Sequence, residues 1–203
     1  FSTYLCHPSM ANNELSGPAL ITKVAKYIKS IKNREYTYRL VILPETIGSI
    51  SYIHKFRKNL KKNIICGFNL SCVGDEREYS FISSKYGNTL SDIALKSALI
   101  GKKKIKYYSF LERGSDERQY CSPGVNLPVS GFSRSKYGAY KEYHTNADNL
   151  KLVTQKGLEQ SFDVIKSIID GFEKCFIPKS KIVCEPNLGS RNLYHTISHK
   201  KNY

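Results

Sequence analysis

Residues 38–60 read YRLVILPETIGSISYIHKFRKNL, and this stretch decides the fold. Its first part, Tyr38 to Leu43, is a largely apolar run of the kind found in strands that are buried on both faces of a sheet. Its second part, residues 45–60, places apolar side chains at the spacing of one face of a helix. These side chains are Ile47, Ile50, Ile53 and Phe56. A buried strand that leads through a short turn into an amphipathic helix is the unit of an α/β fold with a parallel sheet.

The same alternation continues on both sides of this stretch. Strand-like runs lie at residues 2–6, 63–73, 105–110 and 125–129. Helical spacing of apolar residues occurs at 16–32, 90–100 and 148–174, with Asp148 as the expected N-cap of the last helix. Strands that alternate with helices predict an α/β domain with a largely parallel sheet.

After residue 176 the pattern changes, because prolines and polar residues replace the helical period. We therefore predict a domain over residues 1–176 and a linker or tail over 177–203. Two interpretations of the tail remain open, a frayed chain end and a connection to a further domain.

The composition excludes several classes of protein. The 203 residues include 40% hydrophobic residues, enough for one sizeable core without disulfides and too many for a disordered chain. No apolar run reaches the roughly 18 residues of a membrane span, and the six cysteines are scattered, which favours reduced thiols in the cytoplasm. The net charge of +15 lies mainly in blocks at 55–62, 102–106 and 179–201. We interpret these blocks as solvated surface and nucleic-acid binding as a secondary possibility.

Polar residues gather in the loops that follow the predicted strands. These loops are 6–17, 43–49, 72–78 and 113–148. Because ligands of open α/β sheets bind at the carboxyl ends of the strands, we expect the four loops to form one rim with the functional site. No P-loop, G-x-G-x-x-G or G-x-S-x-G sequence occurs, so a nucleotide fold and a serine nucleophile find no support.

The rim contains the residue types of a metal site. His7, Glu14 and His144 offer imidazole and carboxylate donors, and Glu45 is placed to take a proton from a metal-bound water. The other histidines lie in a basic helix and in the tail, where a solvated or structural role is expected.

Five motifs occur in order along the chain: His7-Pro8-Ser9, Asn12 to Gly17, Pro44 to Ser49, Gly114 to Tyr120 and Tyr143 to Asp148. Over residues 1–175 the sequence resembles the bacterial aminopeptidase-like proteins, a divergent branch of the zinc aminopeptidase superfamily often encoded among polysaccharide-biosynthesis genes. The resemblance implies a three-layer, phosphorylase/hydrolase-like α/β fold with a mostly parallel central sheet.

The resemblance also implies roles for individual residues. His7 matches the first metal histidine, Asn13 occupies the place of a bridging aspartate, Glu45 matches the catalytic glutamate and His144 matches the last metal histidine. The stretch 184–191 resembles the lead into a winged-helix domain, which is expected to be missing here together with an N-terminal part.

Four further residues are candidates for holding a substrate. An aminopeptidase needs a carboxylate for the free amine of its substrate, and Asp116, Glu117 and Arg118 are placed to bind a substrate terminus; an ion pair that stabilises the loop is the alternative. Asp75, in the run 75–77, has the same two interpretations.

The departures from the family pattern limit the metal content. Thr46 and Ser71 stand where two-zinc members carry carboxylates, and Asn13 is a poor zinc ligand. We therefore predict one zinc ion, held by His7, by Glu14 or Asn13, and by His144, with Glu45 as general base.

The predicted function is a zinc-dependent, aminopeptidase-type hydrolase that cleaves an amide bond in a peptide or another small substrate. The alternative is an inactive binding or regulatory module linked to surface polysaccharide biosynthesis, with nucleic acid contacted only through the missing winged helix. No membrane partner is expected.

Overall fold

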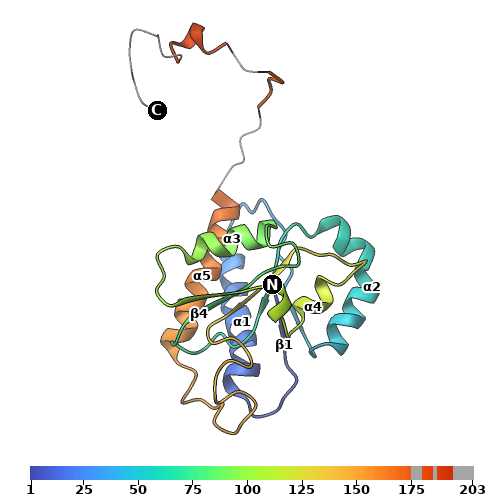
Figure 1. Cartoon of the computed structure of the whole chain (residues 1–203), viewed down its shortest axis with the longest axis vertical. Coiled ribbons are helices and arrows are strands. Elements are labelled where there is room, and N and C mark those ends of the chain that lie inside the picture. The colour runs from blue at the N-terminus through green and yellow to red at the C-terminus, as the bar shows by residue number, and fades with distance from the viewer. Residues whose placement is uncertain (175–179, 185–186, 194–203) are drawn as a thin grey trace.

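The computed structural model describes residues 1–174, 180–184 and 187–193. A six-stranded sheet forms the centre of the molecule, in the order β2-β1-β3-β6-β4-β5 (Figure 1). Its strands are β1 (Ser2–Tyr4), β2 (Val41–Leu43), β3 (Gly67–Leu70), β4 (Tyr79–Ile82), β5 (Ile105–Tyr108) and β6 (Val129–Ser133). All neighbouring strands are parallel except β4 and β6, so the predicted mostly parallel sheet is confirmed.

Helices cover both faces of the sheet and complete three layers (Figure 1). The longer helices are α1 (Ser16–Ser30), α2 (Ile47–Asn63), α3 (Leu90–Leu99) and α5 (Gln155–Lys174). The short ones are the π-helix η1 (Ala11–Leu15), η2 (Phe110–Glu112), α4 (Glu117–Tyr120) and η3 (Gly189–Arg191). Helices α1, α3 and α5 share one core with the sheet, and α2 and α4 share a smaller core on the other face.

The larger core joins helices α1, α3 and α5 to one face of the sheet. It is built from fully buried side chains of α1, α3 and α5 against β3, β4 and β6: Leu20, Val24, Leu70, Phe81, Leu95, Leu99, Phe132, Ile165 and Ile169. In each helix these residues lie four positions apart, and in β3 and β4 a second core residue, Phe68 or Tyr79, lies two positions earlier, which is the pattern that places apolar faces together.

The structure corrects the interpretation of residues 38–60. β2 is an edge strand, and Ile42 is 49% exposed, so the expectation of a strand buried on both faces is wrong. Helix α2 faces the core with Ser49, Ile53 and Leu60, because these positions lie on one narrow arc of the helix. The other apolar residues of this spacing, Ile47, Ile50 and Phe56, lie outside that arc and are exposed.

Two element boundaries and one strand also differ from the expectation. The last helix begins at Gln155 instead of residue 148, and Asp148 is a fully buried loop residue instead of an N-cap. The strand expected at 125–129 lies at Val129–Ser133, and β4 was not predicted. The proposed boundary after residue 176 falls outside the described residues; the described parts of the tail carry only η3. Among the helices of the described chain, none combines the length and apolar character of a membrane span.

Candidate functional site

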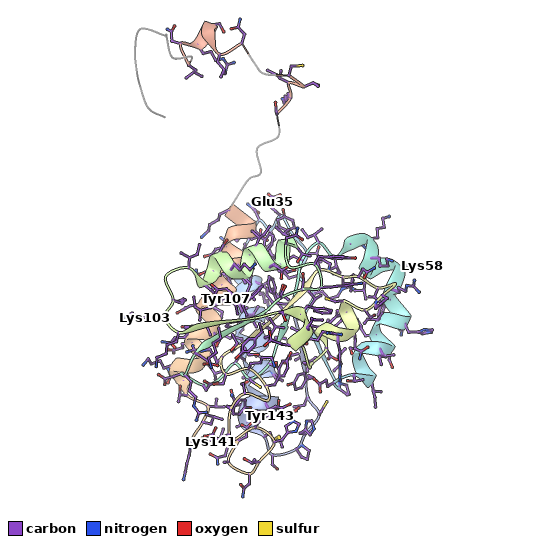
Figure 2. All side chains as sticks on the ribbon, viewed as in Figure 1. Glu35, Lys58, Lys103, Tyr107, Lys141 and Tyr143 are labelled. Atoms are coloured by element: carbon purple, nitrogen blue, oxygen red, sulfur yellow. The ribbon has the colours of Figure 1, made fainter. Side chains whose placement is uncertain are left out.

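The candidate rim lies at the carboxyl ends of β1, β2 and β3. His7 follows β1, Glu45 follows β2, and the motif that begins at Tyr143 approaches from the long loop between β6 and α5. Figure 2 shows Tyr143 and Lys141 on the loops at the lower end of the molecule. The rim therefore forms where the topology of a parallel sheet predicts a site.

The π-helix η1 places three polar side chains of the rim. Asn12, Asn13 and Glu14 are all buried in it. Asp148 anchors this helix, because its carboxylate accepts the backbone N–H groups of Asn12 (2.6 Å) and Asn13 (3.1 Å) and the hydroxyl of Tyr140 (3.0 Å). Single-turn π-helices occur often at functional sites.

The glutamate of η1 is bonded to the first histidine of the rim. The Nδ1 atom of His7 lies 2.8 Å from Oε1 of Glu14, and the side chain of His7 is 41% exposed. Glu14 also accepts Nδ2 of Asn13 at 2.9 Å and the backbone N–H of Cys6. The carboxylate of Glu14 thus has three hydrogen-bond partners, and one of these bonds holds the ring of His7 at the surface.

The second histidine faces the first. The ring centroids of His7 and His144 lie 4.6 Å apart, and the ring of His144 stacks on that of Tyr143 at 3.9 Å and 17°. His144 has a φ angle of 56°, a left-handed conformation that is uncommon for a residue with a side chain. Burial, together with nearby Cys72, Glu45 and Glu14, raises the pKa of Tyr143 to about 12, so this ring is neutral at physiological pH.

Glu45 lies close enough to two other carboxyl groups for their charges to interact. Its pKa is raised, chiefly by partial burial and further by Asp116 and Glu14, whereas a hydrogen bond to the side chain of Ser115 and the charge of Arg118 act in the opposite direction. A carboxylate with a raised pKa is better suited to accept a proton near neutral pH.

The predicted substrate-binding residues are divided between the interior and the surface. Asp116 and Glu117 are both fully buried, while Arg118 is exposed. Asp116 accepts the backbone N–H of Thr46 at 2.9 Å, and Glu117 accepts the hydroxyl of Tyr137 at 2.9 Å. Burial raises the pKa of Glu117 to about 6, with the Tyr137 hydrogen bond opposing the shift.

Asp75 lies inside the loop that follows β3. It is 1% exposed, and its two oxygens accept Nδ2 of Asn12 (3.1 Å), the hydroxyl and backbone N–H of Ser135 (both 2.9 Å) and the N–H of Arg77 (2.9 Å). This carboxylate stabilises its loop through hydrogen bonds. It does not form the ion pair that was the alternative interpretation, since Arg77 pairs with Glu142 instead.

Asn13 has little freedom to serve as a metal ligand. Its side-chain oxygen accepts the hydroxyl of Tyr4 at 2.9 Å, and its nitrogen donates to Glu14. In the described part of the chain, no three or more His, Cys, Asp or Glu side chains stand in an arrangement that could hold a metal ion. The facing imidazoles of His7 and His144 are therefore the feature of the rim that most directly supports a metal site.

Sequence reasoning missed the anchoring role of Asp148 and Tyr140. Both lie in or near a motif that was recognised, but the partner of Asp148 is more than 130 residues away in sequence. Local spacing carries no signal for such a contact, and only the fold brings the two loops together.

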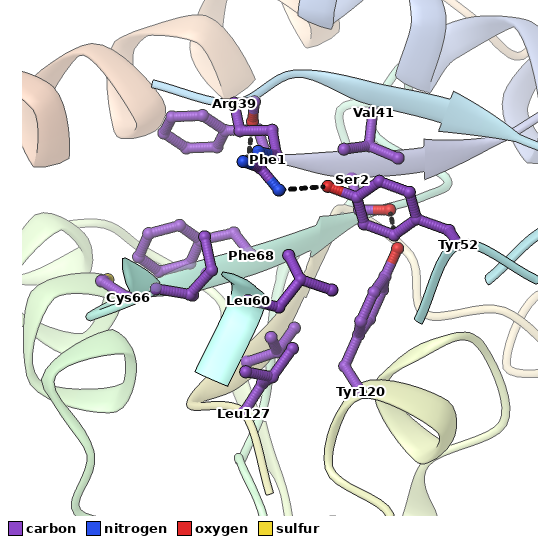
Figure 3. Close-up of a pocket in the computed structure, with 13 residues that line it drawn as sticks. Phe1, Ser2, Arg39, Val41, Tyr52, Leu60, Cys66, Phe68, Tyr120 and Leu127 are labelled. Carbon is purple, nitrogen blue, oxygen red and sulfur yellow. Dashed lines mark hydrogen bonds between the residues drawn. The ribbon is translucent and has the colours of Figure 1, made fainter. Parts of the chain in front are cut away.

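A cavity lies at the opposite end of the sheet from the rim. It encloses about 500 Å³ and is lined mainly by the segments 35–39 and 63–68 with Phe172. A smaller neighbouring pocket is lined by the amino ends of β1, β3 and β6, where Arg39 donates to Tyr52 and Ser2 bonds to Tyr120 (Figure 3). These hollows contain none of the predicted site residues.

Comparison of the sequence with known proteins finds a family model and a curated relative. A family model described as a domain of unknown function, DUF4910, matches residues 1–175. A Clostridium acetobutylicum protein, provisionally named a polysaccharide biosynthesis protein with an aminopeptidase-like domain, is 40% identical over 208 residues, which cover 100% of this chain and 46% of that protein. The chain thus spans less than half the length of this curated relative.

Solved structures agree with this result. A crystal structure from Clostridium acetobutylicum with a provisional peptidase name gives a TM-score of 0.83 at 40% identity, covering 94% of this chain and 45% of that one. The zinc aminopeptidase of Bacillus subtilis gives 0.68 at 19% identity, covering 83% and 45%. The resemblance inferred from the motifs and the aminopeptidase-like α/β fold are both confirmed.

Proposed function

This chain belongs to the DUF4910 family of domains, and on that premise we propose that it is the hydrolytic domain of a zinc-dependent, aminopeptidase-type enzyme. The observation that carries the proposal is the carboxylate of Glu45, with its raised pKa, on the same rim as the facing imidazoles of His7 and His144. The aminopeptidase-like fold supports a hydrolase of this general kind.

The donors on the rim fit one zinc ion in kind. Nδ1 of His7 is engaged by Glu14, so Nε2 is the nitrogen left for an ion, and a metal-ligating histidine commonly bonds a carboxylate through its other nitrogen. His144 offers the second imidazole, and Glu14 or Asn13 offers the third donor. Glu14 is bonded to Nδ1, on the other side of the ring from the proposed ion, so in this arrangement it orients His7, and its carboxylate has to turn to serve as the third donor.

A second zinc ion does not fit these residues. Thr46 and Ser71 offer only hydroxyl groups, and both are already hydrogen-bonded: Oγ1 of Thr46 accepts Arg118 at 2.8 Å, and Oγ of Ser71 lies 3.5 Å from that of Ser133. Zinc prefers nitrogen, sulfur and carboxylate donors, so the proposal is limited to one ion.

In the proposed reaction Glu45 acts as the proton carrier. Its carboxylate takes a proton from the attacking water and passes it to the leaving amine as the amide bond breaks. When bound, zinc would polarise the carbonyl oxygen and acidify the water. The substrate class we propose is a peptide or another small molecule with an amide bond.

Metal content tests the first part of the proposal. Elemental analysis of purified protein is expected to give about one zinc per chain, and His7→Ala or His144→Ala is expected to remove it, since each loses one of two imidazoles. His54→Ala, on the exposed side of α2, is the matched control and should keep the zinc. Absence of zinc from the full-length protein would contradict the metal mechanism.

Hydrolysis assays test the second part. With amino-acid amides and N-acyl sugars as probes, Glu45→Gln is expected to lower kcat at least about 100-fold, because a neutral amide cannot accept the proton. Zinc content should stay at the wild-type level. Activity that is unchanged in Glu45→Gln would show that this residue is not the base.

One observation favours the alternative, a binding or regulatory module connected with surface polysaccharide biosynthesis. Within the described residues no three-donor metal site is assembled, and the curated relative is named for polysaccharide biosynthesis. A zinc-free protein that binds nucleic acid in gel shifts only as part of a longer chain would support this second function.

A further inference from the structure

The backbone after the proposed base adopts a strained turn. Thr46 has φ 62° and ψ −69°, and the N–H of Ile47 donates to the carbonyl of Glu45 at 2.6 Å. These values describe a γ-turn with positive φ, a rare and strained turn, and Thr46 is β-branched, which makes positive φ still less favourable. Glu45 is the first residue of this turn.

Two side chains at the start of α4, distant in sequence, hold Thr46 in that conformation. Oδ1 of Asp116 accepts the N–H of Thr46 at 2.9 Å, and Nη2 of Arg118 donates to the Thr46 hydroxyl at 2.8 Å. Oδ1 of Asp116 also accepts the hydroxyl of Ser49 at 2.7 Å, which ties the turn to the first part of α2. A strained backbone persists only where its surroundings over-determine it, and this network does so.

The burial of Asp116 is itself unusual. Its side chain is fully buried, and Oδ2 has no hydrogen-bond partner among the described residues. A buried carboxylate oxygen without a donor is unfavourable, so its retention calls for an explanation other than stability. A requirement to hold the turn supplies one, since an apolar side chain could not accept the Thr46 N–H.

The same segment also holds the backbone of the base. The N–H that Asp116 accepts belongs to the peptide group that joins Glu45 to Thr46. We infer that Asp116 and Arg118 are positioning residues: they keep Thr46 in the γ-turn and thereby fix the direction of the Glu45 carboxylate. The inference uses the proposed function only for the role of Glu45, and it replaces the substrate-binding role predicted for these two residues.

A stability cycle tests the inference without any activity. Thr46→Gly is expected to raise the midpoint of thermal unfolding by about 2–4 °C, because glycine adopts positive φ without strain. Asp116→Ala is expected to lower the midpoint of thermal unfolding by about 4–8 °C in the natural protein. In the Thr46→Gly variant the same substitution is expected to lower the midpoint by half of that or less. The matched control is Asp92→Ala, which removes an equally buried carboxylate that caps α3 and should have the same effect in both backgrounds.

Kinetics on amino-acid p-nitroanilides with added zinc test the consequence for catalysis. Asp116→Ala is expected to lower kcat at least about 10-fold with KM within about twofold of the natural value, because the base is misdirected while the binding surface stays intact. Asp116→Asn should restore most of kcat, since its amide oxygen still accepts the Thr46 N–H.

The outcomes separate this inference from the proposed function. Equal effects of Asp116→Ala in the two backgrounds would overturn the positioning role, whatever the activity. A rise in KM at constant kcat would also overturn it and return Asp116 to substrate binding. A third outcome is a smaller effect of Asp116→Ala on the unfolding midpoint in the Thr46→Gly background, in a protein that hydrolyses none of the probes. That result would support the positioning role of Asp116 and count against the proposed hydrolase.

Discussion

At the scale of the residue, the molecule is marked by carboxylates that face inward. Six acidic side chains are at most 1% exposed: Glu14, Asp75, Asp92, Asp116, Glu117 and Asp148. Nearly all of their oxygens accept hydrogen bonds from backbone N–H groups, hydroxyls or amides, which offsets the loss of water. Most of them connect loops far apart in sequence, so buried acids assemble the rim together with the apolar cluster of Cys72, Tyr137 and Tyr140.

Glu117 allows a test of this arrangement through pH. Its pKa of about 6 in the folded protein lies above the ordinary 4.5, so the folded state binds the proton more tightly and stability falls as pH rises between the two values. Glu117→Gln removes the charge. The free energy of unfolding of this variant minus that of the natural protein is expected to rise by about 2 kcal/mol from about pH 4 to pH 7.

Urea unfolding at several pH values measures this difference. Exposed Glu159→Gln on α5 is the control, for which the difference should stay flat. A flat difference for Glu117→Gln as well would mean that its carboxyl group titrates normally despite its burial.

The sequence predicted the histidines of the rim better than its acids. His7 and His144 each lie within a recognisable motif, and the structure places their rings 4.6 Å apart. Asp116 and Asp75 lie in loops whose backbone conformation no periodicity specifies. The direction of their side chains therefore could not be predicted, and both point inward.

At the scale of the element, close packing of α5 fixes the loop beneath the rim. The helix begins one residue after Thr154, whose N–H donates to the carbonyl of Gly74 at 2.9 Å. A Cβ atom on Gly157 would lie 2.1 Å from that same carbonyl oxygen. The first turn of α5 therefore touches the backbone that carries Asp75.

We expect Gly157→Ala to destabilise the protein by about 3 kcal/mol, because neither backbone can move away without breaking the loop. Gly171→Ala in the same helix is the control: no atom lies within 4 Å of its added methyl group, and helix propensity should stabilise it by about 0.5–1 kcal/mol. Chemical denaturation of the two variants checks both values, and equal effects would show that the close approach is absent in solution.

Helical periodicity predicted the long elements well and their ends less well. The apolar repeat in 16–32 and 90–100 matches α1 and α3 to within two residues. The segment 148–154 continues the apolar spacing of α5 but is a loop, since Asp148 is drawn into the contact with η1. A tertiary contact here overrides a local pattern.

At the scale of the whole molecule, positive charge is spread over opposite sides. Figure 2 shows Lys58 on α2 and Lys103 beyond α3 at the two sides of the view. Among the described residues α2 carries several cations without a carboxylate partner within 4.0 Å, namely Lys55, Arg57, Lys58, Lys61 and Lys62. Repulsion between like charges therefore opposes the folded state.

Added salt should relieve that repulsion. Raising ionic strength from about 0.01 to 0.15 M is expected to raise the midpoint of thermal unfolding by about 2–5 °C, because screening acts on fifteen unbalanced charges. The double variant Lys58→Glu/Lys62→Glu lowers the net charge by four, from +15 to +11, and should respond less. A midpoint that falls with salt would mean that the surface ion pairs outweigh the repulsion.

The order of the strands also bears on how the chain is made in the cell. Among the described residues β6 is the last strand in sequence order, yet it lies between β3 and β4, and Asp148 comes later still. A nascent chain still on the ribosome can form α1 and α2, but it cannot close the sheet or anchor η1 until these late segments emerge. Incomplete chains therefore expose the edges of β3 and β4, and the rim forms only after all six strands of this sheet have been made.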